Sequence, residues 1–369
     1  MLKILYLLNH AGKGGTERYV YSLARKLNGM EAEVFFAYNE EGPLVDQMKE
    51  LGIPVYRLGM KSRFDFTAAR TLAELCRKLE VDIVHTQFLR EFYIALLSRL
   101  FGNNICIVNT CHVIHTARPV DRFLNKLLSF KNTRTIAVSH AAENMLIRQG
   151  MRSEDISVIH NGVDVDYFTE STPSTIREEL GIDKDSLVAV SIARFSPEKG
   201  HGFLIRSIAR LAETDKDLFS ERKITFLLVG DGQTLEESKK LASELGVSRH
   251  ILFAGYRTDV RNILKGSDIF ICHSVHEALP ISILEALACS LPVITTDVGG
   301  TGEIVNERSQ CGIRVSYGDV DGMARAMKLF FENRQLREQY GRNGLETVKR
   351  EFSIDSMVSK THEIYKNCV

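Results

Sequence analysis

Residues 187–200, LVAVSIARFSPEKG, show the pattern from which the fold can be predicted. The first six residues, Leu187–Ile192, form a short and mainly apolar run, which is typical of a parallel strand buried between two layers of helices. A polar loop with Arg194 and Lys199 follows, and after it the pattern becomes helical. A strand, a loop and a helix in this order form the repeating unit of a doubly wound α/β sheet.

The same unit recurs along the chain in two series. Between the series, Asn161-Gly162 is a turn signal, and residues 169–174 are polar and contain Pro173, as in a linker. We therefore predict a Rossmann-like domain over residues 1–168, a second over 169–352 and a carboxy-terminal helix within 353–369. The predicted strands are Ile4–Leu8, Ala32–Ala37, Ile83–His85, Ile105–Asn109, Thr135–Val138, Leu187–Ile192, Thr225–Val229, Ile251–Phe253, Ile269–Cys272 and Val293–Ile294.

The composition excludes several classes of protein. The chain has 47 basic and 47 acidic residues, and this zero formal charge argues against a protein that coats nucleic acid. No apolar stretch reaches the roughly 18 residues of a membrane span. The seven cysteines include no Cys-x-x-Cys pair, which favours reduced thiols in a cytoplasmic protein.

The first glycine-rich loop, NHAGKGGTER at residues 9–18, follows the first predicted strand. Gly14 and Gly15 would let the backbone approach a ligand, and the helix that follows would offer free N–H groups to an anion. Glu17 stands where the dinucleotide fingerprint needs glycine, and no Gly-Lys-Ser/Thr is present, so the loop is neither that fingerprint nor a P-loop. A plain tight turn before a helix is the alternative.

Two cations, Arg194 and Lys199, lie on one loop at a strand exit. Such a pair suits a diphosphate, whose charge a helix N-terminus also attracts. A second glycine-rich turn, Gly230-Asp231-Gly232, ends the next strand and should lie beside the first loop. An exposed loop with ordinary surface charges is the alternative.

The most specific motif is EALPISILE, residues 277–285. Glu277 lies in a loop, and Glu285 lies on a helix that we expect to begin near Ser282. A carboxylate can accept hydrogen bonds from two vicinal hydroxyls, so one glutamate suits a ribose and the other a sugar ring. Because the neighbours of Glu285 are apolar and a buried unpaired carboxylate is costly, Glu285 requires a polar partner.

Together with HNGVD at residues 160–164, these motifs resemble glycosyltransferase family 4 over nearly the whole chain. The resemblance implies the GT-B fold, two Rossmann-like domains facing across a cleft, with the carboxy-terminal helix crossing back to the first. It also implies a retaining enzyme that uses a nucleotide-sugar. The EALPISILE variant is similar to members that act in exopolysaccharide, capsule and cell-wall polysaccharide assembly.

The resemblance further implies a role for each matching residue. Arg194 and Lys199 would hold the donor diphosphate and stabilise it as it leaves. Glu285 would bind the ribose, and Glu277 would bind the donor sugar with His112 beside it. Departures such as Ala278, where glycine is common, leave the identity of that sugar open. The other implied ligand-binding positions are Gly14 and Gly15, Gly230 and Gly232, Arg257 near the base, and the loop backbone of Leu279, Pro280 and Ile281.

We expect no metal and no other cofactor, because the nucleotide-sugar is itself the substrate. Asp164-Val165-Asp166 and Asp319-Val320-Asp321 match the Asp-x-Asp metal motif. The first falls in the linker region and the second opens a helix, where acidic residues favour the helix dipole. We interpret both as structural.

Residues 118–134 carry five basic residues and one acidic residue, interleaved with apolar residues at near-helical spacing. Such a helix can lie on an anionic membrane, and a helix packed on the sheet with a basic rim is the alternative. The net charge of +6 on residues 1–150 favours membrane contact.

The sequence thus predicts a retaining transferase that moves a sugar from a nucleotide donor, a UDP-sugar rather than a GDP-sugar, to a glycan or lipid-linked saccharide. We expect it in the cytoplasm or on the inner face of the membrane. Two alternatives stay open: a nucleotide-sugar 2-epimerase of the same architecture, and a non-catalytic nucleotide-sugar-binding subunit of an assembly complex.

Overall fold

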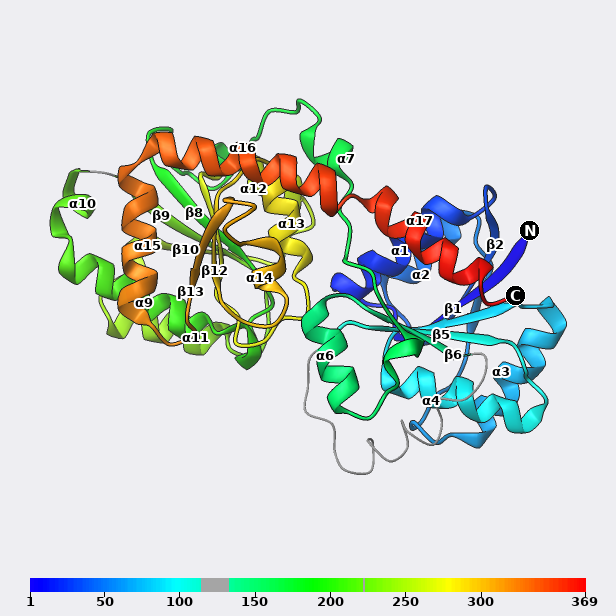
Figure 1. Ribbon diagram of the computed structural model, residues 1–369. Coiled ribbons are helices and arrows are strands. Elements are labelled where there is room, and N and C mark those ends of the chain that lie inside the picture. Colours follow the sequence, from blue (N-terminus) through cyan, green and yellow to red (C-terminus); the bar gives the residue numbers. More distant parts are fainter. Residues whose placement is uncertain (114–132, 222) are drawn as a thin grey trace. The chain divides into compact units, whose positions relative to one another are not determined.

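The computed structural model describes residues 1–113, 133–221 and 223–369, which form two compact units (Figure 1). Unit 1 contains Met1–Gly162 and Ile354–Val369, and unit 2 contains Val163–Ser353. The chain therefore leaves unit 1 once and returns to it for its last helix.

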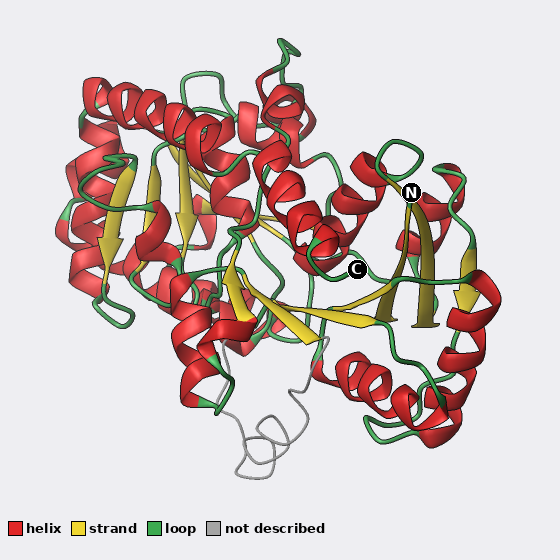
Figure 2. Ribbon diagram, turned by 45° about the vertical axis from the view of Figure 1, so that its right-hand side comes forward, coloured by secondary structure: helices red, strands yellow, loops and turns green. Residues whose placement is uncertain are grey.

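Unit 1 is built on a seven-stranded parallel sheet in the order β3-β2-β1-β4-β5-β6-β7. The long apolar run of β1 is buried through its middle because helices cover both faces of the sheet (Figure 2). The strands are β1 (Leu2–His10), β2 (Ala32–Glu40), β3 (Val55–Arg57), β4 (Ile83–Thr86), β5 (Cys106–Cys111), β6 (Thr133–Ala137) and β7 (Ile156–Val158).

The helices of unit 1 include the carboxy-terminal helix α17, which lies beside α1 in Figure 1. Ile354, Met357, Val358 and Tyr365 of α17 are buried in the same apolar cluster as β1, β2 and α1. The helices are α1 (Gly15–Leu27), α2 (Pro43–Glu50), α3 (Phe66–Leu79), α4 (Leu89–Leu97), α6 (His140–Arg148) and α17 (Ile354–Lys366).

Unit 2 is built on a six-stranded parallel sheet in the order β10-β9-β8-β11-β12-β13. Its core packs the sheet against α9 and α15, with Phe226, Phe330 and Phe331 fully buried. The strands are β8 (Leu187–Ile192), β9 (Ile224–Val229), β10 (Ile251–Gly255), β11 (Ile269–Cys272), β12 (Val293–Thr296) and β13 (Gly312–Val315).

The helices of unit 2 surround this sheet (Figures 1 and 2). They are α7 (Val165–Thr169), α8 (Ile176–Glu179), α9 (His201–Thr214), α10 (Lys216–Glu221), α11 (Leu235–Glu244), α12 (Val260–Lys265), α13 (Ile281–Ala288), α14 (Thr301–Ile304), α15 (Val320–Glu332) and α16 (Arg334–Glu351).

Both sheets reverse their strand order at one point. In unit 1 the reversal lies between β1 and β4, and in unit 2 it lies between β8 and β11. In doubly wound sheets, ligands bind outside the carboxyl ends of the strands at this switch point. The loops after β1, β4, β8 and β11 are therefore the places where a site is expected.

The predicted α/β fold with two parallel sheets is confirmed. The predicted strands did not include β3, β7 and β13. All three are short and lie at an edge of a sheet, where a strand is only partly buried and lacks a continuous apolar run.

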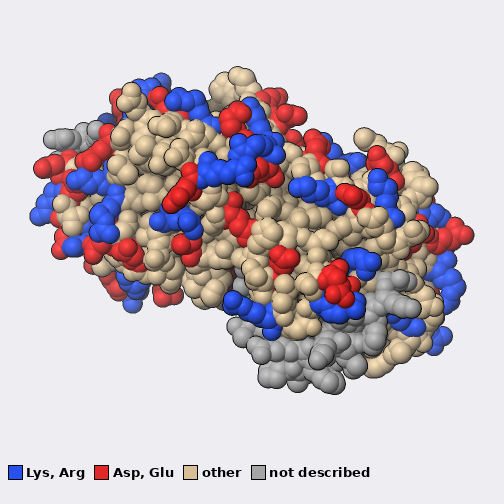
Figure 3. All heavy atoms as spheres, in the orientation of Figure 1, with Lys and Arg blue, Asp and Glu red and all other residues tan. Residues whose placement is uncertain are grey.

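No described helix is long and apolar enough to cross a membrane. On the visible face in Figure 3, basic and acidic side chains are interspersed, in keeping with the zero formal charge.

Candidate functional site

The loops after β8 and β9 line a hollow of about 340 Å³ in unit 2. Its walls are Arg194, Phe195, Ser196 and Glu198 from the first loop and Gln233 from the second. The two loops meet because β8 and β9 are neighbours, as the sequence predicted. The hollow therefore lies at the carboxyl edge of the sheet, one strand from the switch point.

Gly230 and Gly232 let these two loops approach closely. Both have a φ near +146°, and a Cβ atom on Gly230 would lie 2.0 Å from the carbonyl oxygen of Ala193. A Cβ atom on Gly232 would lie 2.3 Å from the carbonyl oxygen of Phe195. The second turn can therefore lie against the Arg194 loop only as glycine.

Lys199 and Glu277 connect the loops on the two sides of the switch point. The Lys199 ammonium donates to Glu277 Oε1 at 2.6 Å, and the Ser274 hydroxyl donates to the same oxygen at 2.7 Å. Burial lowers the pKa of Lys199, but the charge and hydrogen bond of Glu277 outweigh it and raise that pKa above its ordinary value. Lys199 therefore stays a cation.

His273 fixes the backbone on which Lys199 stands. Its Nδ1 lies 2.6 Å from the Lys199 carbonyl oxygen and its Nε2 lies 2.8 Å from the Ser191 hydroxyl. Gly200 has a φ of +72°, and a Cβ atom there would lie 2.5 Å from the His273 carbonyl oxygen. The β8 loop is thus held tightly against β11.

Arg194 extends toward solvent and is paired with Glu198 at 2.7 Å. Ser196 also donates to the Glu198 carboxylate, at 2.6 Å. Burial raises the pKa of Glu198, but the hydrogen bonds from Ser196 and Arg194 lower it to about 2 overall. The hollow therefore contains a permanent carboxylate beside its arginine.

The motif of residues 277–285 spans the loop after β11 and the first turns of α13. Leu279 and Pro280 are buried, and the helix begins at Ile281, one residue before the predicted start. Glu285 is 4% exposed on this largely buried helix. The Ile283 N–H donates to the Pro280 carbonyl oxygen at 3.2 Å, and the N–H groups of Ile281 and Ser282 lie at the helix start, where an anion or a sugar hydroxyl can bind.

Arg257 follows β10 and is engaged by two carboxylates. Its guanidinium lies 2.6 Å from Asp259 and 2.8 Å from Glu179. Those hydrogen bonds raise the pKa of Arg257. A nucleotide base near this residue would meet a side chain that is already fixed in place.

In unit 1 the glycine loop follows β1, and Gly14 caps the N-terminus of α1. The carboxylate of Glu91, on α4, accepts a hydrogen bond from the Asn9 N–H at 2.5 Å, and Arg90 donates to the Asn9 side chain at 2.8 Å. Glu91 is fully buried, and its Oε2 has no hydrogen-bond partner among the described residues. Burial raises the pKa of Glu91 to about 7.

His112 follows β5 and is oriented by neighbours from two elements. Its Nε2 lies 2.8 Å from Gln87 Oε1, and the Tyr19 ring meets it edge-on with centroids 4.8 Å apart. Burial lowers the pKa of His112 to about 3, so the ring is neutral at pH 7. His112 and the Gly14-Gly15 loop belong to unit 1, whereas the other predicted site residues belong to unit 2.

The first aspartate of each Asp-x-Asp segment caps a helix. Asp164 accepts a hydrogen bond from Tyr167 N and caps α7, and Asp319 accepts one from Gly322 N and caps α15. Asp321 pairs with Arg210 at 2.6 Å.

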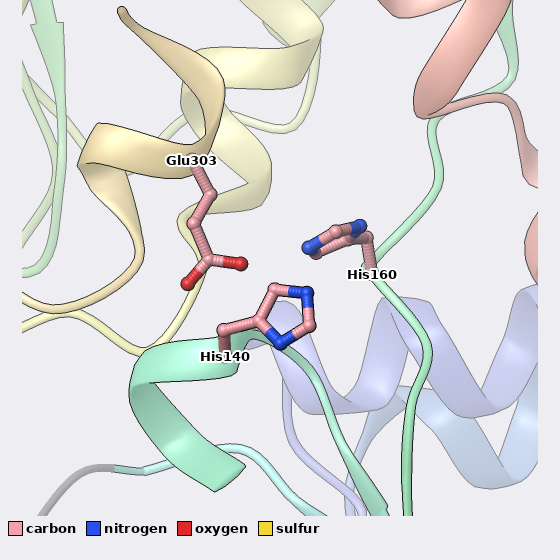
Figure 4. Close-up of side chains that lie close together, drawn as sticks. All are labelled: His140, His160 and Glu303. Carbon is pink, nitrogen blue, oxygen red and sulfur yellow. The ribbon is translucent and has the colours of Figure 1, made fainter. Parts of the chain in front are cut away.

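Figure 4 labels three further groups of metal-ligating type. His140 and His160 of unit 1 lie with ring centroids 6.0 Å apart, and Glu303 lies on α14 of unit 2. His140 also pairs with Glu143 at 3.0 Å.

The sequence interpretation missed Glu198, Ser274 and His273. Glu198 follows Arg194 by four residues within one loop, and this spacing could have indicated the pair. Ser274 and His273 directly follow a strand at the switch point, so their position after β11 was the available signal. Most of the basic stretch 118–134 lies outside the described residues.

Two family models together match most of the chain. The model described as "Glycosyltransferase Family 4" matches residues 13–167, and that described as "Glycosyl transferases group 1" matches residues 173–347. The two matches fall on the two sheets.

Two curated proteins are similar over nearly their full length. N-acetyl-alpha-D-glucosaminyl L-malate synthase of Bacillus anthracis is 26% identical, covering 86% of this chain and 82% of that protein. UDP-Gal:alpha-D-GlcNAc-diphosphoundecaprenol alpha-1,3-galactosyltransferase of Escherichia coli is 24% identical, covering 96% and 94%.

Solved structures share the fold. A glycosyltransferase from Rickettsia africae superposes with a TM-score of 0.87 at 24% identity, covering 100% of this chain and 98% of the other. Anabaena Alr3699/HepE in complex with UDP-glucose superposes with a TM-score of 0.86 at 20% identity, covering all of both chains.

Proposed function

Since this chain belongs to the glycosyltransferases, with a family 4 domain followed by a group 1 domain, we propose that it transfers a sugar from a UDP-sugar to a glycan or lipid-linked saccharide. The transfer retains the configuration at the anomeric carbon and serves cell-surface polysaccharide assembly. The relatives support the substrate classes: one is named for a UDP-galactose donor and a diphosphoundecaprenol-linked acceptor.

One observation carries the proposal. The loop after β8 lines the hollow with Arg194 and also carries Lys199, which pairs with Glu277 across the switch point of unit 2. Doubly wound sheets bind nucleotides at this place. Cations beside a carboxylate suit a ligand that is anionic at one end and rich in hydroxyls at the other, as a nucleotide-sugar is.

The residues act on the leaving group and on the sugar. Arg194 and Lys199 neutralise the charge that develops on the diphosphate when the glycosidic bond breaks. Glu277, held by Lys199 and Ser274, accepts hydrogen bonds from the donor sugar, and Glu285 accepts them from the ribose. The amides at the start of α13 complete the sugar site.

The test is transfer to a defined acceptor. Purified protein is incubated with UDP-sugars or GDP-sugars and with GlcNAc-diphospho-lipid, with or without EDTA. We expect one UDP-sugar to give a product one sugar heavier by mass spectrometry, unchanged by EDTA, with an α-linkage from an α-donor by NMR.

Two results would contradict parts of this account. An inverted linkage would overturn retention, and conversion of the donor to its 2-epimer without acceptor would identify an epimerase. Absence of any turnover in a sample that still binds UDP would favour a non-catalytic nucleotide-sugar-binding subunit.

A lipid-linked acceptor would place the enzyme at the cytoplasmic membrane surface, and the basic composition of residues 118–134 supports contact with anionic lipid. Co-sedimentation with phosphatidylglycerol vesicles at low salt should exceed that with phosphatidylcholine vesicles. Equal sedimentation with both would contradict the contact.

A further inference from the structure

A row of buried polar side chains crosses unit 1 from the carboxy-terminal helix to the end of β5. The Tyr365 hydroxyl of α17 lies 2.5 Å from His85 Nδ1, and His85 Nε2 lies 2.7 Å from the Thr110 hydroxyl. The Tyr19 hydroxyl of α1 lies 3.2 Å from the same Thr110 oxygen. None of these four side chains is more than 2% exposed.

The row ends next to His112. In the parallel pairing of β4 with β5, His85 is opposite Val108, and alternate residues share a face. His85 and Gln87 therefore lie on the same face as Thr110 and His112. His85 contacts Thr110, and Gln87 contacts His112 at 2.8 Å, so two side-chain hydrogen bonds join the two strand ends.

Tyr19 connects the two contacts. Its hydroxyl bonds Thr110, while the edge of its ring packs at 73° against the His112 ring. The Tyr19 ring that faces His112 is therefore positioned by the Thr110 hydroxyl, which also contacts His85. Thr110 lies two residues before His112 in the chain and is hydrogen-bonded to Tyr19. A shift of Thr110 would therefore reach His112 both through the backbone and through the Tyr19 ring.

The protonation of His112 follows from its surroundings. Burial lowers the pKa of both His85 and His112 to about 3, so each ring carries one N–H at pH 7. With Gln87 Oε1 as acceptor, the proton of His112 is on Nε2 and donates to Gln87. His112 Nδ1 is then left as a hydrogen-bond acceptor, which suits a hydroxyl group.

Aliphatic side chains at these four positions would fill this part of the core without removing any polar group from water. Buried polar networks with their hydrogen bonds made fix one arrangement of side chains more narrowly than apolar packing does. Packing alone does not require such polar contacts. Here they connect the carboxy-terminal helix α17 to the ring of His112, a predicted site residue.

We propose that His85 and Tyr365 are positioning residues that act through Thr110 and Tyr19 to hold the His112 ring where its Nε2–H donates to Gln87, with Nδ1 ready to accept a hydrogen bond from a sugar hydroxyl. The proposal rests on the proposed function and on the family resemblance, which implies that His112 lies beside the donor sugar. It makes the last helix of the chain part of the support for that ring.

The sharpest test compares two substitutions of one residue. Thr110→Val keeps the shape of the side chain and removes the hydroxyl, whereas Thr110→Ser keeps the hydroxyl and removes a methyl group. Tyr365→Phe removes the hydroxyl that lies 2.5 Å from His85 Nδ1 and 3.2 Å from the Tyr6 hydroxyl. Tyr38→Phe is the matched control, because Tyr38 is buried in the same apolar cluster and stacks on Phe36.

The first readout is independent of activity. In protein with ¹⁵N-labelled histidine, two-bond ¹H–¹⁵N correlation spectra at pH 7 report the tautomer of His112, assigned through its loss in His112→Ala. We expect a single Nε2–H tautomer in the parent, Thr110→Ser and Tyr38→Phe, and a mixture in Thr110→Val and Tyr365→Phe. The same tautomer in all of these proteins would overturn the proposal.

The second readout is turnover with the UDP-sugar that the transfer assay identifies. Thr110→Val and Tyr365→Phe should lower kcat by roughly tenfold or more, with the Kd of UDP unchanged, while Thr110→Ser stays near the parent. In a His112→Ala background, Tyr365→Phe should have no further effect. A larger loss in Thr110→Ser than in Thr110→Val, or additive losses in the double variant, would show a packing role and overturn the proposal.

Failure of the proposed function gives a different pattern. If His112→Ala leaves turnover unchanged while the spectra show the predicted tautomer changes, the sugar-facing role of His112 is wrong and its coupling to Tyr365 stands.

Discussion

At the scale of single residues, each cation of the candidate site already has a carboxylate partner. Lys199 pairs with the half-buried Glu277, and Arg194 pairs with Glu198 at the rim of the hollow. A diphosphate entering the hollow must therefore draw Arg194 away from Glu198, and the Glu198 charge opposes its approach.

Removing that charge should strengthen nucleotide binding. We expect Glu198→Gln to lower the Kd of UDP about fivefold, equivalent to about 1 kcal/mol, because Arg194 no longer has an anionic competitor. Isothermal titration calorimetry measures this. Glu213→Gln is the control, since Glu213 is an exposed partner of Arg210 on α9. An unchanged or higher Kd in Glu198→Gln would contradict the competition.

Glu91 gives a prediction about pH. Its pKa of about 7 in the folded protein is above the ordinary value of 4.5, because the carboxyl group is buried. Between about pH 4.5 and pH 7, the folded state therefore binds more protons than the unfolded state. The contribution of Glu91 to stability is complete below about pH 4.5 and is lost as the pH rises through 7.

Glu91→Gln removes the pH dependence of stability that comes from the Glu91 carboxyl group. The glutamine side chain keeps an oxygen that can accept the hydrogen bond from the Asn9 N–H. We expect the variant to have a higher free energy of unfolding than the parent at pH 8, by up to about 3 kcal/mol, and an equal one near pH 4.5. Urea titrations at both pH values test this. A difference that is the same at both values would contradict the raised pKa.

At the scale of elements, the turn after β9 depends on glycine. Gly230→Ala would place a Cβ atom 2.0 Å from the Ala193 carbonyl oxygen in a backbone conformation with φ of +146°. We expect a loss of about 3 kcal/mol or more in the free energy of unfolding, measured in urea. Gly246→Ala is the matched control.

Gly246 also has a positive φ, +70°, but nothing lies within 4 Å of its added Cβ atom. The control should therefore lose only about 1 kcal/mol. Equal losses in the two variants would show that backbone conformation alone, and not the approach to the Arg194 loop, requires Gly230.

The strands that could be predicted are those buried on both faces of the sheet. Strands such as Leu187–Ile192 and Ile269–Cys272 have apolar runs that cannot face water on either side. The edge strands β3, β7 and β13 were not predictable in this way, because half-buried strands of three or four residues carry too short a pattern. The positions of Lys199 and Glu277 followed from the strands before them.

In the molecule as a whole, the sequence could not indicate the contacts between side chains that are far apart in the chain. Tyr365 and His85 are 280 residues apart and share a hydrogen bond. From the sequence, His85 could be placed only at the end of a predicted strand. Only the return of α17 to unit 1 decides that it is buried.

The division into units makes its own prediction. Unit 2 is one continuous segment with its own apolar core, whereas unit 1 needs the distant residues 354–369. We expect a fragment of residues 163–353 to fold cooperatively and residues 1–162 alone to be much less stable. Thermal unfolding followed by circular dichroism tests this. A cooperative transition in 1–162 at the temperature of the full chain would contradict it.

The central claim is that unit 2 binds a uridine nucleotide between Arg194, Lys199, Glu277 and Glu285. Calorimetric titration of the full chain with UDP, GDP and ADP, beside a Lys199→Met variant, tests it most directly. We expect UDP to bind the parent protein more tightly than GDP or ADP does, and the variant to bind UDP at least about tenfold more weakly, with a parent-like melting temperature. Failure of the folded parent to bind any of the three nucleotides, or equal UDP affinity in parent and variant, would contradict it.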